Sequence, residues 1–527
     1  MKSILSAIRK AVPPFNNDLI VGLRQREVKG VADFIVERYR ECLGVIDQNL
    51  ELMGYRALGP VERLNIELRS NKQVNVINIM NDEASLVEFQ FRYHDHVFTK
   101  LLYIPYIYEN STIVIGGTKH ECLLSMTEKI FSVRTGSNGI TIKLIRSPIS
   151  FWKNTLYAFK DVVTDEEFLH SVTTCKIHSK KSSTSPKKIK PSAIHYLLCK
   201  FTLPEILHKF EIPAGAASFS STPDTYDEKY YYFKVQNLAI AKLPILLKVD
   251  KELMHTNRPL RDVVAAIVYL MSGFRSVSYE DLIIDSQTIF KVLLGKLIYS
   301  ISIDKLHALS YMDKHVENVD IYLDSYTRNI LKSNGIIVHD IYDLICFVVR
   351  NIDSIVLNCP NNNMYNKRLE TINNVIVDSL ISALYYKIYK IEKKDNPVYM
   401  DEMIEKALGV TPRFLVKNLG MSENVRSSPA VYGDNWLLTI GDKIVKRLSA
   451  TTKSNVPGAK KSHGGDLNAA VHKFHPSMIA VESAVGFSNS PGINALINPY
   501  MKIDEFGGFV RDEFTEEIAE LSKYLPK

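Results

Sequence analysis

The spacing of hydrophobic residues changes along this chain, and the change restricts the folds that it can adopt. Residues 31–46 carry apolar side chains at helical spacing, whereas residues 87–93 and 140–144 alternate in the manner of strands. One hydrophobic core rarely serves more than about 300 residues, so 527 residues with this pattern predict an α+β multidomain protein. Helices are expected in the middle of the chain at 262–274, 286–301, 340–357 and 368–395.

Composition narrows the class of protein but not its function. With 46% hydrophobic and 23% charged residues the chain is typical of a globular protein. No apolar run approaches the roughly 18 residues that span a bilayer, so neither a membrane segment nor a signal peptide is expected. The six cysteines lack CxxC spacing and are expected to be reduced thiols. A net charge of +7 is mild for this length, so the location of the charge matters more than its sum.

Catalytic and metal-binding motifs are not found in the sequence. It has no P-loop, no GxSxG and no HExxH, and it lacks the DxDGD carboxylate cluster that holds catalytic magnesium for nucleotidyl transfer. The pairs His94/His96 and His472/His475 have spacings that zinc could use, but without companion ligands ordinary packing is the preferred interpretation. The sequence therefore predicts no catalytic residue and no metal ligand in this chain.

Two segments concentrate positive charge. From Lys443 to Lys473 there are seven Lys or Arg residues against a single Asp, with three glycines among them. Glycine lets the backbone approach a phosphate backbone, and Lys and Arg neutralise phosphates without reading bases. The alternative is a solvated basic turn. The other segment, "SKKSSTSPKKIKPS" (179–192), cannot form a core and is expected to be a flexible Lys/Ser loop.

Several short motifs within and after the first basic segment occur in a fixed order. "KRLSA" (446–450), "HP" (475–476), "SPGINALIN" (490–498) and "DEFGGFV" (504–510) resemble the fork region of the β subunit of multisubunit DNA-dependent RNA polymerases. A further segment, "YIPYIYENSTIVIGGTKH" (103–120), resembles a segment near the N-terminus of the same subunits. Because two separate anchors match in the right order, the resemblance is specific.

The resemblance implies a domain organisation. Residues 1–150 with 375–430 would form a mixed protrusion-like domain, and residues 151–374 a largely helical lobe-like domain. Residues 431–527 would form an irregular fork region of RNA polymerase β type, with a basic fork loop at 451–465. The chain ends just past the fork region, which leads us to expect an N-terminal fragment of a split β subunit, of the kind that giant bacteriophages encode.

The same resemblance implies contacts with nucleic acid. Arg447 and Ser449 would face the nascent RNA in the RNA–DNA hybrid, with Lys446 close by, and the basic loop would lie where the two DNA strands part. The nucleic-acid-binding residues expected on this basis are Lys446, Arg447, Ser449, Lys453, Lys460, Lys461 and Lys473. The scaffold beneath them is expected to include His475, Pro491, Ile493 and Asn498.

The resemblance to RNA polymerase β subunits also implies partners. The chain would be a subunit of a nucleotidyltransferase, a DNA-directed RNA polymerase, and would form one jaw of its DNA cleft during transcription. It would bind a C-terminal β-like fragment, β′-like fragments, template DNA and nascent RNA, with a σ-like promoter-specificity subunit left open. Mg²⁺ would be held by the β′-like partner. The expected location is the cytoplasm of the infected bacterial host, with packaging in the virion left open.

Two hypotheses from other functional classes are also compatible with the sequence. One is a phage structural or host-interaction protein without a role in transcription, which the mild charge and the lack of catalytic motifs fit equally well. The other is a free-standing nucleotidyltransferase of a different fold, which would need paired carboxylates that the sequence does not offer.

Overall fold

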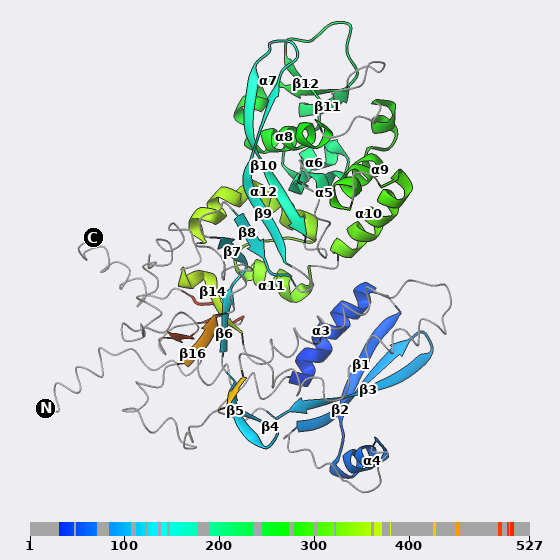
Figure 1. Cartoon of the computed structure of the whole chain (residues 1–527), viewed down its shortest axis with the longest axis vertical. Helices are drawn as coiled ribbons and strands as arrows, with labels where there is room; N and C mark the ends of the chain where they lie inside the picture. The colour runs from blue at the N-terminus through cyan, green and yellow to red at the C-terminus, as the bar shows by residue number, and fades with distance from the viewer. Residues whose placement is uncertain are drawn as a thin grey trace, which may run out of the picture. The chain divides into compact units, whose positions relative to one another are not determined.

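The structure is a computed structural model, and it divides into two compact units (Figure 1). Unit 1 combines residues 1–129 with residues 362–527, and unit 2 comprises Ile130–Asn361. The residues that the structure describes are 31–46, 49–70, 84–106, 112–122, 124–134, 139–144, 148–177, 190–235, 245–272, 279–299, 303–320, 323–359, 363–370, 380, 425–427, 448–452, 494–497, 503–504 and 506–510. None of the helices among them combines the length and the hydropathy that a membrane span requires.

Unit 1 begins with a helix packed on a three-stranded antiparallel sheet of order β1-β2-β3 (Figure 1). The apolar stripe of the helix is buried, with Ile35 and Leu43 fully inaccessible to solvent. Arg40 donates from Nε to the Leu52 carbonyl (2.9 Å) and from Nη2 to the Met53 carbonyl (2.7 Å), where a bulge interrupts the β1–β2 ladder. The elements are α3 (Val31–Ile46), β1 (Leu50–Ala57), α4 (Pro60–Ser70), β2 (Ala84–Tyr93) and β3 (His96–Pro105).

Two further sheets complete the described part of unit 1. One has the order β15-β5-β4 and the other the order β14-β6-β16-β17. Both pair strands from the beginning of the chain with strands from its end, so unit 1 is closed by long-range contacts. The strands are β4 (Thr112–Ile115), β5 (Thr118–Cys122), β6 (Leu124–Glu128), β14 (Lys367–Glu370), β15 (Val425–Ser427), β16 (Leu448–Thr452) and β17 (Asn494–Ile497), and the 3₁₀ helix η3 (Met364–Asn366) precedes β14.

Unit 2 is built around a four-stranded antiparallel sheet in which neighbours in sequence are neighbours in space. Its order is β10-β9-β8-β7, and β9 and β10 form a long hairpin that runs through the unit in Figure 1. The hairpin tip is fixed because Asp161 accepts from the amides of Thr164 (2.7 Å) and Tyr232 (2.6 Å). The strands are β7 (Phe131–Arg134), β8 (Gly139–Ile142), β9 (Ile149–Lys160) and β10 (Glu167–Ile177).

Helices and a second, three-stranded sheet of order β11-β13-β12 bury the inner face of this hairpin. In Figure 1 the helices α9 and α10 lie side by side. Asp side chains cap several helix starts, as Asp250 does for α7 and Asp340 for α12. The elements are α5 (Ala193–Leu198), α6 (Leu203–Lys209), η2 (Ala214–Ala216), β11 (Ala217–Ser220), β12 (Tyr230–Lys234), β13 (Leu246–Asp250), α7 (Lys251–Thr256), α8 (Arg258–Ser272), α9 (Tyr279–Ile298), α10 (Lys305–Asp320), α11 (Ser325–Ser333) and α12 (Ile341–Asn358).

One continuous hydrophobic core holds unit 2 together, and aromatic side chains lie at its centre. Phe233 is fully buried and contacts Phe159 edge to face, with ring centroids 4.9 Å apart, and Phe168 in the same way at 5.3 Å. The core extends from β7 to α12. Burying one large apolar side chain contributes about 1.5–3 kcal/mol, so this cluster is the main source of stability in the unit.

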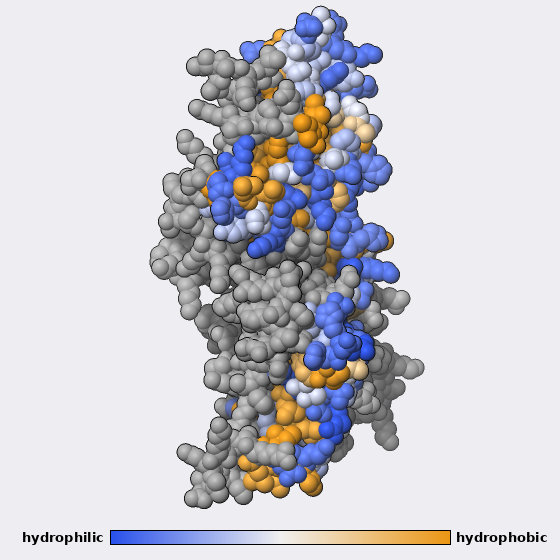
Figure 2. All heavy atoms as spheres, turned by 90° about the vertical axis from the view of Figure 1, so that its right-hand side faces the viewer, coloured by the Kyte–Doolittle hydropathy of each residue, from blue (hydrophilic) through white to orange (hydrophobic). Residues whose placement is uncertain are grey.

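Some hydrophobic side chains remain exposed. In the lower part of Figure 2, at the height that α4 occupies in Figure 1, hydrophobic side chains lie on the surface. On α4, Val61, Leu64 and Leu68 form an exposed stripe. On the outer face of the β9–β10 hairpin in unit 2, Leu156 and Leu169 are also exposed.

The structure differs from the sequence-based expectations at three points. The division falls at 129/130 and 361/362 rather than at 150/151 and 374/375, because β7 and β8 belong to the same ladder as β9. The helix predicted from Arg368 is wrong at its start, since Lys367–Glu370 is strand β14. Unit 2 is also less helical than expected, because seven strands lie within 131–250.

Other local expectations are confirmed. The helix at 31–46 and the strand over 87–93 are present as α3 and β2, and the helices predicted at 262–274, 286–301 and 340–357 correspond to α8, α9 and α12. Most of the loop expected at 179–192 lies outside the described residues. Its last three residues are ordered, since Lys190 donates its amide to the Tyr269 hydroxyl and Ser192 caps α5.

Candidate functional site

The candidate site is the place where the motif segments of the sequence meet. Among the expected site residues, Ser449 lies in a described strand. The others lie outside the described residues, namely Lys446, Arg447, Lys453, Lys460, Lys461, Lys473, His475, Pro491, Ile493 and Asn498. Strands β16 and β17, which border several of them in the sequence, are described.

The "KRLSA" and "SPGINALIN" motifs pair with each other. Strand β16 runs antiparallel to β17, with Leu448 opposite Ile497, Ser449 opposite Leu496 and Ala450 opposite Ala495. Residues 453–493 therefore leave and re-enter the same two-stranded ladder. The backbone hydrogen bonds of this ladder hold the described residues that flank 453–493, on β16 and β17, at neighbouring positions.

The same ladder is joined to the strand that follows the N-terminal anchor. Strand β6 pairs in parallel with β16, placing Leu124 opposite Ala450 and Thr452 opposite Met126. Strand β5, which contains the end of "IGGTKH", pairs with β15, so that His120 lies opposite Ser427. Both segments that carry the resemblance are thus parts of unit 1, but they lie in different sheets, and β6, the strand after the N-terminal segment, is the one that pairs with β16. We call the β14-β6-β16-β17 sheet the root sheet.

The "DEFGGFV" motif forms a tight turn against the edge of the root sheet. We call Asp504–Val510 the closing turn; Glu505 in it lies outside the described residues. Asp504 Oδ1 accepts from the amides of Phe506 (2.9 Å) and Gly508 (2.7 Å), which fixes the turn internally. The Leu369 amide donates to the Gly507 carbonyl (2.8 Å), and the Phe509 amide donates to the Lys367 carbonyl (3.1 Å). The turn therefore adds to the β14 edge.

Glycine is required at Gly507. This residue has a φ of +81°, and a Cβ there would lie 2.3 Å from the Leu369 carbonyl oxygen. The left-handed backbone disfavours an L side chain, and the close approach to β14 excludes one without displacement of the turn. The first of the two glycines in the motif is thus explained by the docking of the turn onto the sheet.

Charged side chains join the closing turn to the root sheet. Lys129, directly after β6, donates from Nζ to the Phe509 carbonyl (2.7 Å) and lies 3.9 Å from Asp504 Oδ2. Burial lowers the pKa of Lys129, and the Asp504 carboxylate opposes that shift. Within the root sheet itself, Lys367 of β14 contacts Glu128 of β6 at 2.9 Å. Sequence reasoning missed Lys129, because its partner Phe509 is 380 residues away along the chain.

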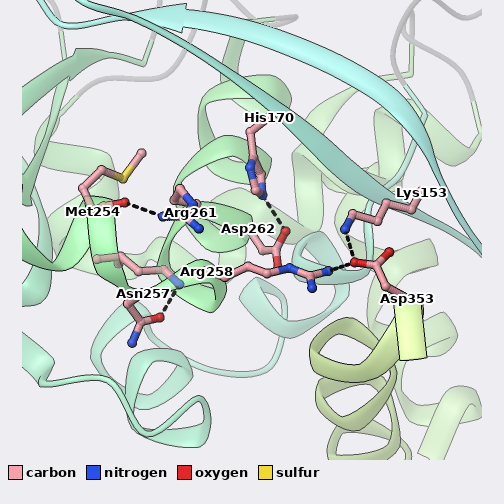
Figure 3. A network of polar contacts seen from close by, with 9 residues as sticks. Lys153, His170, Met254, Asn257, Arg258, Arg261, Asp262 and Asp353 are labelled. Atoms are coloured by element: carbon pink, nitrogen blue, oxygen red, sulfur yellow. Dashed lines mark hydrogen bonds and ion pairs between the residues drawn. The ribbon is translucent and has the colours of Figure 1, made fainter. Parts of the chain in front are cut away.

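A second polar cluster lies in unit 2, and Figure 3 shows it. Asp353 of α12 accepts from Lys153 of β9 (2.6 Å) and pairs with Arg258 at the start of α8. His170 Nε2 of β10 lies 2.7 Å from Oδ1 of the buried Asp262. Burial raises the pKa of Asp353, but the hydrogen bond from Lys153 and the charge of Arg258 outweigh it, so the pKa lies below its usual value.

The unit 2 cluster has the geometry of a structural interlock. Its cations are directed at carboxylates that belong to other elements, and the cluster ties the β9–β10 hairpin to α8 and α12 (Figure 3). In the part of the chain that the structure describes, no group of three or more His, Cys, Asp or Glu side chains is arranged to hold a metal ion. His94 and His96, the described pair with a possible zinc spacing, lie at the β2–β3 turn.

Comparison with known proteins gives the family. The model of the family described as "Non-virion RNA polymerase subunit" matches residues 2–518. This chain belongs to the non-virion RNA polymerase subunit family. No curated protein matches the chain.

Membership of this family settles the coarse function. The protein is a subunit of a phage RNA polymerase and acts in transcription together with other polymerase subunits. The polymerase is a non-virion enzyme, which answers the question of packaging that the sequence left open. The alternative of a phage protein without a transcription role does not fit this membership.

Proposed function

We propose that the chain is the β-like subunit that supplies the N-terminal part of β in a multisubunit phage RNA polymerase. The proposal rests on the order of the motifs, together with one structural observation. The strand of "KRLSA" is hydrogen-bonded to the strand of "SPGINALIN" on one side and to the strand after "IGGTKH" on the other. The two C-terminal motif strands and the strand that follows the N-terminal motif therefore lie in one sheet, although they are far apart in sequence.

In this proposal, the two units have different roles in the DNA cleft. Unit 1 corresponds to the protrusion-like domain with the fork region, and unit 2 corresponds to the lobe-like domain. Together they form one jaw of the cleft. The hairpin of unit 2 suits a wall of the cleft because Asp161 holds its tip to β12 and the Lys153–Asp353–Arg258 cluster holds it against α8 and α12.

The nucleic-acid contacts in this proposal extend from the root sheet. Arg447 and Ser449 face the nascent RNA of the hybrid, with Lys446 beside them, and the fork loop at 451–465 lies where the DNA strands separate. The remaining contacts with phosphates are made by Lys453, Lys460, Lys461 and Lys473. Positioning a polynucleotide requires a fixed base, and the β16–β17 ladder supplies backbone pairing at that base. His475, Pro491, Ile493 and Asn498 support the same region.

The chemistry of nucleotide addition is assigned to partners. Two Mg²⁺ ions that clamp an in-line displacement would be held by a β′-like subunit. A C-terminal β-like fragment would complete the fork, and a σ-like subunit would select promoters if the enzyme needs one. This chain contributes the positioning of template and transcript.

A photocrosslinking experiment tests the proposal directly. A photoreactive amino acid replaces Ser449 in the assembled polymerase, and elongation complexes are stalled on a template with radiolabelled RNA. We expect a crosslink to RNA close to its growing end, because β16 lies beside the hybrid in this proposal. The same residue at Leu169, on the exposed outer face of the unit 2 hairpin, serves as the control and should not reach the RNA near that end.

Two outcomes would contradict the proposal. If position 449 in a stalled complex crosslinks only to protein, the root sheet does not lie beside the RNA–DNA hybrid. If this chain carries out template-directed synthesis without any other subunit, catalysis does not belong to a β′-like partner, and the proposal is wrong.

A further inference from the structure

Lys129 occupies the junction between the two halves of unit 1. It follows β6 directly, and its amide donates to the Asn366 carbonyl (2.7 Å), which places it at the start of the β6–β14 ladder. Its side chain is 13% exposed and reaches the closing turn, where Nζ donates to the Phe509 carbonyl (2.7 Å). The residue therefore contacts the sheet through its backbone and the turn through its ammonium group.

The closing turn is shaped to admit this side chain. A Cβ on Gly508 would lie 2.4 Å from Lys129 Cε and 2.5 Å from Asp504 Oδ2. The Lys129 side chain therefore occupies the space beside Gly508 that the side chain of any larger residue would need. The Asp504 carboxylate lies 3.9 Å from Nζ and also accepts from the Gly508 amide (2.7 Å). One carboxylate thus organises both the turn and the ammonium group that holds it.

The contact has a direct connection to the strand of "KRLSA". Lys129 extends β6, and β6 pairs in parallel with β16 over Ala450–Thr452. On the other side β6 pairs with β14, to which the closing turn is hydrogen-bonded. A displacement of the turn can therefore reach β16 across β6 alone by way of Lys129, or across β14 and β6 by way of the backbone.

We propose that Lys129 is a positioning residue for RNA synthesis, which clamps the closing turn to the root sheet and so fixes the placement of Leu448–Thr452. This inference rests on the proposed function, because it assumes that β16 lies beside the RNA–DNA hybrid. Neither the family match nor the resemblance assigns a role to Lys129.

The experiment compares two lysines of equal burial. Lys129→Met removes the ammonium group that holds the turn. Lys367→Met removes an ammonium group that is also 13% exposed but contacts Glu128 instead. Both variants are assembled into the complete polymerase, and single-nucleotide addition is measured. For Lys129→Met we expect kcat to fall about tenfold or more with KM for nucleotide changed little, since misplacement of a positioning element acts on the reaction step. For Lys367→Met we expect both constants to stay within about twofold of the unchanged enzyme.

A second variant disturbs the same Lys129 contact through a change within the closing turn. Gly508→Ala crowds Lys129 Cε and Asp504, so it should lower kcat as Lys129→Met does. If both changes act on one clamp, the fall in kcat of the double variant should be much smaller than the product of the two single reductions. Independent, multiplicative effects would overturn the inference, and so would normal elongation by Lys129→Met or an equal loss in Lys367→Met. If Lys129→Met does not assemble, the kcat of Gly508→Ala decides in its place.

The crosslink at position 449 separates failure of this inference from failure of the proposed function. If the unchanged enzyme gives no RNA crosslink from position 449, the proposed function fails. If that crosslink forms and is equally efficient and equally placed in Lys129→Met, only the positioning role fails. A crosslink that weakens or shifts along the RNA in Lys129→Met, and not in Lys367→Met, is the expected result.

Discussion

Unit 1 and unit 2 are stabilised in different ways. In unit 2 the strands β7, β8, β9 and β10 pair in chain order and a single core covers them. In unit 1 the root sheet joins strands from both sides of unit 2 in the sequence, and Lys129 contacts a carbonyl 380 residues away. Local pairing has a low loop-closure cost, whereas the root sheet must pay that cost before its contacts form. The candidate site is therefore located in the part of the protein that depends most on the two distant segments meeting.

The largest expected effect tests whether the two units unfold independently. Phe233→Ala empties the aromatic centre of unit 2 and should lower its free energy of unfolding by about 3–5 kcal/mol, because Phe233 is fully buried against Phe159 and Phe168. Denaturant titration gives the magnitude, and hydrogen exchange gives its location. Amides of unit 2 should lose protection while the Leu369 and Phe509 amides keep theirs. Equal loss in both regions would show that the units form one cooperative structure.

A pH effect of similar size should be confined to unit 2. His195 is buried, its Nδ1 accepts from the Ser192 amide (3.0 Å), and its Nε2 donates to the Ala266 carbonyl (3.0 Å), so the folded state holds it neutral. Burial lowers its pKa from 6.5 to about 4, which the hydrogen bond to Ala266 only partly opposes.

The sign of this effect follows from proton binding. Between pH 6.5 and about 4 the unfolded chain binds the proton and the folded chain does not. The stability contribution is therefore complete above pH 6.5 and decreases as the pH falls, by about 3 kcal/mol at 1.36 kcal/mol per pKa unit. Urea titrations between pH 7 and 4 measure it. His195→Gln should flatten the profile, and an unchanged profile in that variant would assign the pH dependence to other groups.

The next effect compares two glycines of the same backbone conformation, one from each unit. Gly507 has φ +81° and is pressed against the Leu369 carbonyl, whereas Gly335 has φ +78° and no atom near the position of a Cβ. Gly335→Ala should cost about 1–2 kcal/mol for the left-handed backbone alone. Gly507→Ala should cost about 1–3 kcal/mol more because the turn must move away from β14. Comparable losses in unfolding free energy would mean that the turn is not tightly docked.

The prediction with the smallest expected effect concerns a carboxylate that two cations share. Asp353→Asn leaves Lys153 and Arg258 without their common anion, and Asp313→Asn removes the anion of Lys291 alone. Asp353 is 46% exposed, so solvent screening keeps the loss to about 1 kcal/mol or less. In the same denaturant titration, Asp313→Asn should lower the free energy of unfolding by less than Asp353→Asn does. The pKa of Asp353 lies below its usual value, so its contribution is present above about pH 4 and is lost as the pH falls further. Equal losses in the two variants would argue against a shared role.

The sequence by itself determined the local structure. Helical spacing of apolar residues identified α3, α8, α9 and α12, and alternation identified β2, because a buried face fixes the period of the side chains that form it. The fixed order of short motifs also indicated an RNA polymerase subunit, in agreement with the family of the chain. Those inferences need only neighbouring residues or their order along the chain.

The tertiary structure alone decided how distant segments combine. Arg368–Glu370 read as part of a helix, yet it is a strand because β6 offers it a partner. The domain boundaries moved because β7 and β8 pair with β9. Lys129 could not be singled out from the sequence, since its role depends on a carbonyl and a carboxylate supplied from the far end of the chain. Strand pairing and burial of charge are properties of the folded backbone, and no local pattern of residues encodes which partner will be near.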